Sequence, residues 1–192
     1  GILSSAINTA VIDWGIPIPS NPVQFSRVPK YDDRRDRRLE DDEEERLLKL
    51  APPEFQRYII DALETAMRRS EILRIRKSHI DFGKKILVIP ETKNGKSRTI
   101  SLSTNAIRAF RDQLLMFSDT NVIQIERDPL IFTFTLRMFR RTFDRLRVKL
   151  DMKDWRPHDL RHTYATYAAI LTKDIRMVQQ SLGHTTLKMT QR

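Results

Sequence analysis

The sequence Pro-His-Asp-Leu-Arg-His-Thr-Tyr-Ala-Thr, at residues 157–166, contains the two side chains on which the assignment of the fold depends. His158 and Arg161 lie three positions apart in what we expect to be the first turn of a helix, so both face the same side. An imidazole can transfer a proton, and a guanidinium can hold a phosphate with two donors. The pair therefore indicates phosphate chemistry, although it proves little by itself.

Two further stretches flank this pair along the chain. Arg68 and Glu71 lie upstream, in Thr-Ala-Met-Arg-Arg-Ser-Glu-Ile-Leu at residues 65–73, and His184 lies downstream in Leu-Gly-His at residues 182–184. The spacing of Glu71 allows it to pair with Arg68 and to fix the planar guanidinium. The alternative for this pair is a surface ion pair, worth only about 0.5 kcal/mol.

The composition indicates a DNA-binding or RNA-binding protein with a sizeable core. The 192 residues suffice for one domain, or for one domain and a fragment of another, and 40% of them are hydrophobic. The formal net charge of +10 favours a polyanion or an anionic membrane surface over solubility alone. The absence of Cys excludes disulfides, thiolate zinc sites and Cys nucleophiles. No apolar run approaches 18 residues and no signal-peptide pattern is present, so we expect a cytoplasmic protein without a membrane partner.

The pattern of prolines and charges divides the chain. Residues 1–14 have the apolar spacing of a helix that ends near Trp14. Residues 15–38 contain four prolines and a highly charged run, which is typical of an extended linker. The main domain is expected to open near Leu39, where five acidic residues precede an apolar run and mark a helix start.

The main domain reads as mainly helical with one small antiparallel sheet, an α+β class. Strands are predicted where the period changes to two, with Gly83 and the Asn94-Gly95 pair at the turns. Residues 130–134 are a candidate short extended piece. The predicted strands are 79–82, 85–89 and 97–102, and the predicted helices are 53–67, 69–77, 104–117, 135–150, 158–171, 173–182 and one that starts at 185.

Basic residues surround the expected hairpin tip. Lys93, Lys96 and Arg98 are all close to Asn94-Gly95, and such a tip can carry a lysine into a groove beside a leaving group. Lys96 and Arg98 are expected to contact DNA. The alternative is a solvated basic turn.

The predicted helix 135–150 is the second basic element. Its apolar stripe consists of Leu136, Phe139, Phe143, Leu146 and Leu150, and its other faces carry Arg137, Arg140, Arg141 and Arg145. A helix of this kind suits a DNA major groove, where arginines contact phosphates or guanine edges. The alternative is the solvated face of a core helix.

The histidines do not favour a metal site. No His-Glu-x-x-His motif occurs, and His158 and His162 flank Arg161, whose charge disfavours a nearby cation. We therefore expect neither metal nor other cofactor. His162 is expected to point elsewhere on its helix, and Tyr164 and Tyr167 are expected to be core aromatics rather than nucleophiles.

The three motifs occur in the order and at about the spacing found in tyrosine recombinases, the phage integrase family, and the chain from about residue 39 onward resembles their catalytic domain. The resemblance implies the DNA breaking-rejoining fold of that domain for residues 39–192. It identifies residues 1–22 as the C-terminal remnant of a helical, SAM-like core-binding domain and residues 23–38 as the interdomain linker. It also implies a bacterial or phage protein associated with the nucleoid.

The same resemblance implies a role for each motif residue. Arg68 and Arg161 would hold the non-bridging oxygens of one DNA phosphate, with Glu71 supporting Arg68. Lys93 would protonate the leaving oxygen; Lys96 is the other choice, because alignment across the tip is ambiguous. His158 would move the proton of the nucleophile and His184 would donate to the phosphate.

The family's nucleophilic tyrosine would be expected just after Arg192, where the sequence ends. The 192-residue chain would therefore bind DNA weakly and cleave nothing. The whole enzyme would act as a tetramer on double-stranded DNA, whereas this chain would be a monomer. The predicted function is site-specific recombination that integrates or excises a mobile element through a 3′-phosphotyrosyl link. The alternatives are a Xer-type resolvase of chromosome dimers and a non-catalytic DNA-binding remnant; a type IB topoisomerase is less favoured.

Overall fold

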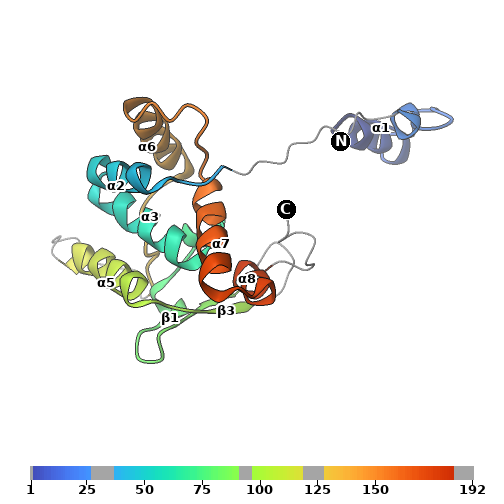
Figure 1. The fold of residues 1–192 in the computed structure, drawn as a ribbon. Helices are drawn as coiled ribbons and strands as arrows, with labels where there is room; N and C mark the ends of the chain where they lie inside the picture. The colour runs from blue at the N-terminus through green and yellow to red at the C-terminus, as the bar shows by residue number, and fades with distance from the viewer. Residues whose placement is uncertain (1, 27–36, 91–96, 119–127, 184–192) are drawn as a thin grey trace. The chain divides into compact units, whose positions relative to one another are not determined.

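The computed structural model describes residues 2–26, 37–90, 97–118 and 128–183 (Figure 1). The chain forms two compact units, residues 1–35 and 36–192, and each is considered by itself. Within the parts described, no helix is long and apolar enough to cross a lipid bilayer.

The first unit contains helix α1 (Ile2–Ile12) and the 3₁₀ helix η1 (Pro22–Phe25). Asn21 connects them, because its amide nitrogen donates to the carbonyl of Ser4 at 2.9 Å and to Oδ1 of Asn8 at 2.7 Å. Its Oδ1 accepts from the backbone N–H of Val23 and caps η1. The interpretation of this unit as a remnant of a core-binding domain, followed by a linker, stays a prediction.

The second unit is built around α3, which packs against α5 and α7. Pro53 begins α3, as expected for a residue whose missing N–H costs nothing in a first helical turn. Its inner face buries Phe55, Tyr58 and Ile59. The helices are α2 (Asp41–Leu50), α3 (Pro53–Thr65), α4 (Arg69–Ile72), α5 (Thr104–Ser118), α6 (Leu136–Lys149), α7 (Asp159–Thr172) and α8 (Ile175–Leu182), with the 3₁₀ helix η2 (Lys77–His79).

The sheet has three antiparallel strands in the order β1-β2-β3. These are β1 (Ile80–Asp81), β2 (Ile86–Ile89) and β3 (Arg98–Ser101). Leu87 lies opposite both Ile80 and Ile100, and all three are buried, because residues directly opposite each other on neighbouring strands point to the same face of the sheet. The Asn94-Gly95 tip between β2 and β3 lies outside the described residues.

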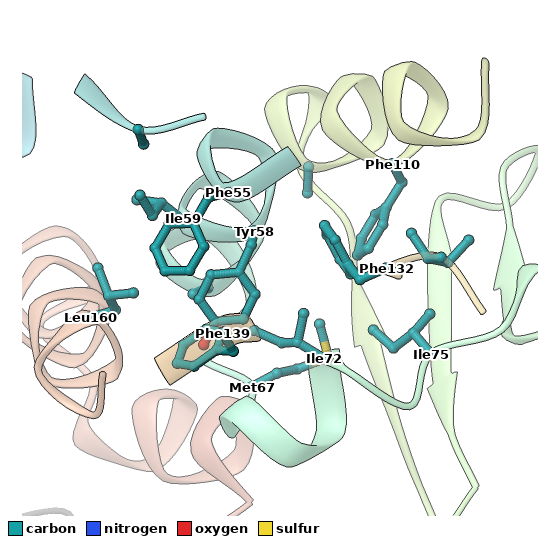
Figure 2. Packing of buried hydrophobic residues seen from close by; sticks show 14 of the residues in the cluster. Phe55, Tyr58, Ile59, Met67, Ile72, Ile75, Phe110, Phe132, Phe139 and Leu160 are labelled. Atoms are coloured by element: carbon teal, nitrogen blue, oxygen red, sulfur yellow. The ribbon is translucent and has the colours of Figure 1, made fainter. Parts of the chain in front are cut away.

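Aromatic side chains from several segments form the main core (Figure 2). Phe55 and Tyr58 of α3 contact Phe139 of α6, with ring centroids 5.2 Å and 4.9 Å apart. Tyr58 also meets Phe132 edge-on at 6.1 Å. The core therefore lies between α3, α6 and the extended piece that contains Phe132.

The predicted fold class, mainly helical with a small antiparallel sheet, is confirmed. Two details differ. The helix predicted at 69–77 ends at Ile72, because the carbonyl of Ile75 instead accepts from the N–H of Ile131 at 2.8 Å. Leu136, predicted to lie on the apolar stripe of its helix, is 46% exposed because it occupies the first position of α6.

Candidate active site

Arg68 lies at the junction between α3 and α4. The chain leaves α3 through Ala66 in the left-handed conformation (φ 52°), and Arg68 is the extended residue that caps α4. Its Nη1 is 2.8 Å from Oε1 of Glu71, while its own backbone N–H donates to Oε2 at 2.8 Å. The predicted pair is therefore formed, and the buried carboxylate fixes a guanidinium whose side chain is 25% exposed.

Arg161 projects from the first turns of α7 and is only 4% exposed. Its Nη1 donates to the carbonyl of Ala66, and its Nη2 donates to the carbonyl of Leu182. Both carbonyls belong to residues at or just after the end of a helix, where orphan carbonyls need partners. Arg161 thereby joins the ends of α3 and α8, and three of its five N–H donors are not used by these two bonds.

His158 immediately precedes α7 and is exposed to solvent. Its ring meets that of His162 edge-on, with centroids 4.9 Å apart, so His162 lies against the site and does not point elsewhere as expected. Partial burial of the imidazole, followed by repulsion from His162, Arg161 and Arg68, lowers the pKa of His158 to about 4. A neutral imidazole at physiological pH can accept a proton.

Arg98 enters this cluster from the sheet. Its Nη2 is 2.9 Å from Oε2 of Glu71, and its Nη1 donates to the carbonyl of Ser181 at 3.4 Å. The sequence grouped Arg98 with the hairpin-tip cations for DNA contact, but its side chain is only 13% exposed. Its partners are protein groups of the site, and a direct contact with DNA is untested.

The charges of the cluster do not balance. Arg68 and Arg98 both pair with the carboxylate of Glu71, and Arg161, which bonds to two carbonyls, feels the same carboxylate electrostatically. Burial, then repulsion from Arg68 and Arg98, lowers the pKa of Arg161 to about 9, and Glu71 opposes that shift. An anion placed between these groups would relieve the repulsion, so the site favours a phosphate.

A small second core holds these elements together. Ala66, Val178 and Leu182 are buried in one cluster, and Tyr164 packs against it. The expectation that Tyr164 is a packing residue agrees with this contact. Segments remote in sequence thus converge on Arg68, His158 and Arg161.

Several predicted site residues lie elsewhere. Lys93, Lys96 and His184 fall outside the described residues. The four arginines proposed for DNA contact on α6 are all exposed, and no contact with the Arg68 cluster is recorded for them: Arg137, Arg140, Arg141 and Arg145. In the described part of the chain, no group of three or more His, Cys, Asp or Glu side chains could hold a metal ion.

Arg98 was predicted as a DNA contact and not as a partner of Glu71, and His162 was not predicted to lie at the site. For Arg98 the available signal was Gly183, since a glycine before His184 suits a close approach by another group. A Cβ built on Gly183 would lie 2.2 Å from Nη1 of Arg98. For His162, nothing in the sequence indicated that its ring would contact His158 and not another neighbour.

Comparisons with known proteins agree with this geometry. The family model described as Phage integrase family matches residues 37–192, so the chain belongs to that family. The chain is 34% identical over its whole length to a shufflon-specific DNA recombinase of Escherichia coli, of which it covers 48%. It is 26% identical to the tyrosine recombinase XerA of Pyrococcus furiosus, with 86% of the chain and 59% of that protein covered. The chain thus spans about half the length of these relatives.

Solved structures share the fold. An integrase of transposon Tn1549, determined with circular intermediate DNA, matches 97% of this chain and 70% of its own with a TM-score of 0.70 and 21% identity. The catalytic domain of bacteriophage HP1 integrase matches 81% of this chain and 84% of its own, with a TM-score of 0.61 and 21% identity. The expected recombinase catalytic-domain fold is confirmed.

Proposed function

We propose that this chain is the catalytic domain of a site-specific recombinase that breaks and rejoins double-stranded DNA through a phosphotyrosyl intermediate. The observation that carries the proposal is the convergence of Arg68, His158 and Arg161, from α4 and α7, beside the end of α8. The cluster has an excess of positive charge and a neutral base, which suits an anionic phosphodiester. The relatives' names and the DNA in the Tn1549 structure support the same substrate.

The reaction assigned to the site is an in-line displacement at phosphorus. A tyrosine hydroxyl, expected just after Arg192, attacks the phosphate and gives its proton to His158. The bond from phosphorus to the 5′ oxygen breaks, and Lys93 protonates that oxygen. The 3′-phosphotyrosyl bond conserves the free energy of the broken bond, so rejoining to another 5′ hydroxyl needs no nucleotide hydrolysis.

The arginines stabilise the charge that develops in the transition state. Arg68 and Arg161 donate to the non-bridging oxygens, and His184 adds a further donor. Loss of one such donor typically costs about 3–4 kcal/mol of barrier, or roughly 10²–10³ in rate. Because Glu71 already fixes Arg68, little ordering of that side chain remains for the reaction.

Integration or excision of a mobile element is the role we favour, with a tetramer acting on DNA and this chain alone a monomer. We place the enzyme in the cytoplasm, on the nucleoid. The similarity to XerA supports a second candidate, resolution of chromosome dimers. The DNA captured by the enzyme distinguishes them: ends of a mobile element support the first role, and one chromosomal site supports the second.

Covalent capture from DNA of random sequence tests the function and requires no choice of target site. The protein, extended past Arg192 through the expected tyrosine, is mixed with a pool of nicked random duplexes. Complexes that survive detergent are recovered. We expect adducts whose digestion yields a peptide with DNA linked to tyrosine through a 3′ phosphate.

Two variants control the capture experiment. Arg161→Lys keeps the charge but loses the planar fork, and we expect adducts to fall by at least about 100-fold. Arg108→Met removes an exposed guanidinium of α5 and should leave the yield unchanged. Absence of any adduct from the unaltered protein, or an adduct on a residue other than tyrosine, would contradict the proposed function.

A further inference from the structure

Arg98 connects three elements of the site. It is the first residue of β3, where it lies opposite Ile89 of β2. Its guanidinium donates to Glu71, the carboxylate that fixes Arg68, and to the carbonyl of Ser181 near the end of α8. One side chain therefore links the sheet, the first arginine of the site and the helix that leads to His184.

Gly183 makes this position of Arg98 possible. The glycine has φ +61° and ends α8, and a Cβ there would lie 2.2 Å from Nη1 and 3.2 Å from both Cδ and Cζ of Arg98. Backbone and guanidinium thus approach each other more closely than a side chain at position 183 permits. Since Gly183 immediately precedes His184, Arg98 supports the point from which the chain continues to that residue.

Burial of the Arg98 guanidinium is unfavourable, and Glu71 compensates for it only in part, so the pKa of Arg98 is lowered. Burial lowers the pKa of Arg98, the Glu71 carboxylate raises it, and repulsion from Arg68 lowers it again. Its Nε is buried with no hydrogen-bond partner among the described residues. A surface cation kept for solubility would not adopt such a position, so a role in the site accounts for it better.

We propose that Arg98 is a positioning residue of the phosphate site, which acts through Glu71 on Arg68 and through Ser181 and Gly183 on the end of α8. The inference deepens the proposed function and rests on it. Arg98 does not itself need to reach DNA, because its Nη1 and Nη2 each donate to a protein acceptor. A direct phosphate contact is the competing role, and it predicts weaker DNA binding when Arg98 is removed.

Arginine-selective NMR of this chain tests the positioning without any catalysis. The guanidinium of Arg68, paired with Glu71, should rotate slowly about its Cζ–Nε bond and give separate Nη signals. We expect these signals to merge in Arg98→Met and Arg98→Lys, and to stay separate in the control Arg108→Met. Unchanged Arg68 signals in a folded Arg98 variant would overturn the proposal. If Arg98→Met does not fold, Arg98→Lys decides, because it keeps the buried charge.

Cleavage in the extended protein supplies the second readout. We expect single-turnover cleavage to fall about 10-fold in Arg98→Lys and about 100-fold in Arg98→Met, with DNA affinity within about twofold of the unaltered protein. Added to Glu71→Gln, the Arg98→Met change should cost much less than it does alone, because both act on Arg68. Additive losses, or a loss of affinity that matches the loss of rate, would overturn the proposal. If the unaltered protein forms no adduct, the proposed function fails, while the NMR result still decides the role of Arg98.

Discussion

His158 lies where protonation would add a positive charge beside two arginines. Since its pKa is lowered to about 4, the folded protein binds this proton less tightly than the unfolded chain, whose His pKa is about 6.5. The contribution of His158 to stability is therefore full above about pH 6.5 and is lost as pH falls toward 4. DNA should reverse part of the shift, because a phosphate anion stabilises the imidazolium.

Proton NMR of the imidazole measures this shift directly. We expect a resonance that disappears in His158→Gln and titrates near pH 4 in the free chain. In the complex with DNA, the same resonance should titrate at higher pH. A midpoint near 6.5 in the free chain, or no movement on binding DNA, would show that the arginines do not act on His158.

Asp61 is a second residue with an unusual environment. Its side chain is fully buried on α3, and neither carboxylate oxygen has a hydrogen-bond partner in the described part of the protein. Burial, assisted by the charge of Glu64 and opposed by Arg57, raises the pKa of Asp61 well above its usual range. The folded state holds this proton more tightly, so stability is lost as pH rises above the unfolded pKa of roughly 4.

Asp61→Asn keeps the shape and removes the titration. We expect the free energy of unfolding at pH 8 to rise by about 1–3 kcal/mol, because the variant neither takes up a proton on folding nor buries a charge. The gain should become small near pH 4, where the carboxyl of the unfolded chain also takes up its proton. Urea unfolding at the two pH values measures the difference, and a destabilised variant at pH 8 would contradict this reading of Asp61.

Side-chain contacts within one helical turn could be predicted from residue spacing, whereas contacts between distant segments of the chain could not. The contact between Arg68 and Glu71 follows from their spacing on a helix. The partners of Arg98 lie 27 and 83 positions away, so no local pattern could reveal them. The charge suggested a DNA contact for Arg98, which stays a prediction, while its contact with Glu71 depends on the fold.

At the scale of elements, Thr163 ties α7 to the start of the second unit. Its hydroxyl accepts from the backbone N–H of Leu39 at 2.8 Å and donates to the carbonyl of Asp159 at 2.9 Å. Thr163 is fully buried, and Leu39 is 1% exposed. The Thr that follows His162 in the motif thus holds the helix that carries Arg161 against the beginning of the fold.

Thr163→Val should leave the N–H of Leu39 buried without an acceptor. We expect a loss of about 1–3 kcal/mol in the free energy of unfolding. The matched control is Thr166→Val on the same helix, because the Thr166 hydroxyl donates to the His162 carbonyl at 3.1 Å. Denaturant titrations of both variants measure the difference; equal stabilities would show that the bond to Leu39 contributes nothing.

Long periodic elements were predicted well because one face of each is buried. The helix predicted at 104–117 is found at Thr104–Ser118, and the one predicted at 158–171 at Asp159–Thr172. The helix predicted at 69–77 was too long, since pairing of Arg76 with Leu130 takes over beyond Ile72. Such pairing depends on a segment far along the chain, so it produces no hydrophobic periodicity from which a helix or strand could be predicted.

At the scale of the whole molecule, the net charge of +10 predicts DNA binding that weakens steeply with salt. The exposed arginines of α6 are the proposed phosphate contacts outside the active site. Each contact contributes about 0.9 to the slope of log affinity against log salt concentration. Arg140→Gln together with Arg141→Gln should therefore reduce the slope by about 2, equally for all sequences.

The control for α6 removes the same charge elsewhere. Lys49→Gln with Arg108→Gln changes exposed cations on α2 and α5 and should leave the slope unchanged. Fluorescence anisotropy across a range of salt concentrations measures both variants. Equal slopes for the two pairs of substitutions would show that the arginines of α6 form a solvated helix face and do not contact DNA phosphates.

We propose that the arginine cluster balances the charge of one DNA phosphate. The most direct measurement is the cleavage rate of a captured site whose scissile phosphate is replaced by a neutral methylphosphonate, in the extended protein and in Arg68→Ala. On ordinary DNA we expect the variant to be slower by about 10²–10³. On the neutral substrate we expect the variant to be slower by no more than about tenfold, because no charge remains for Arg68 to balance. An equal loss of rate on both substrates would show that Arg68 does not act by balancing the charge of the phosphate.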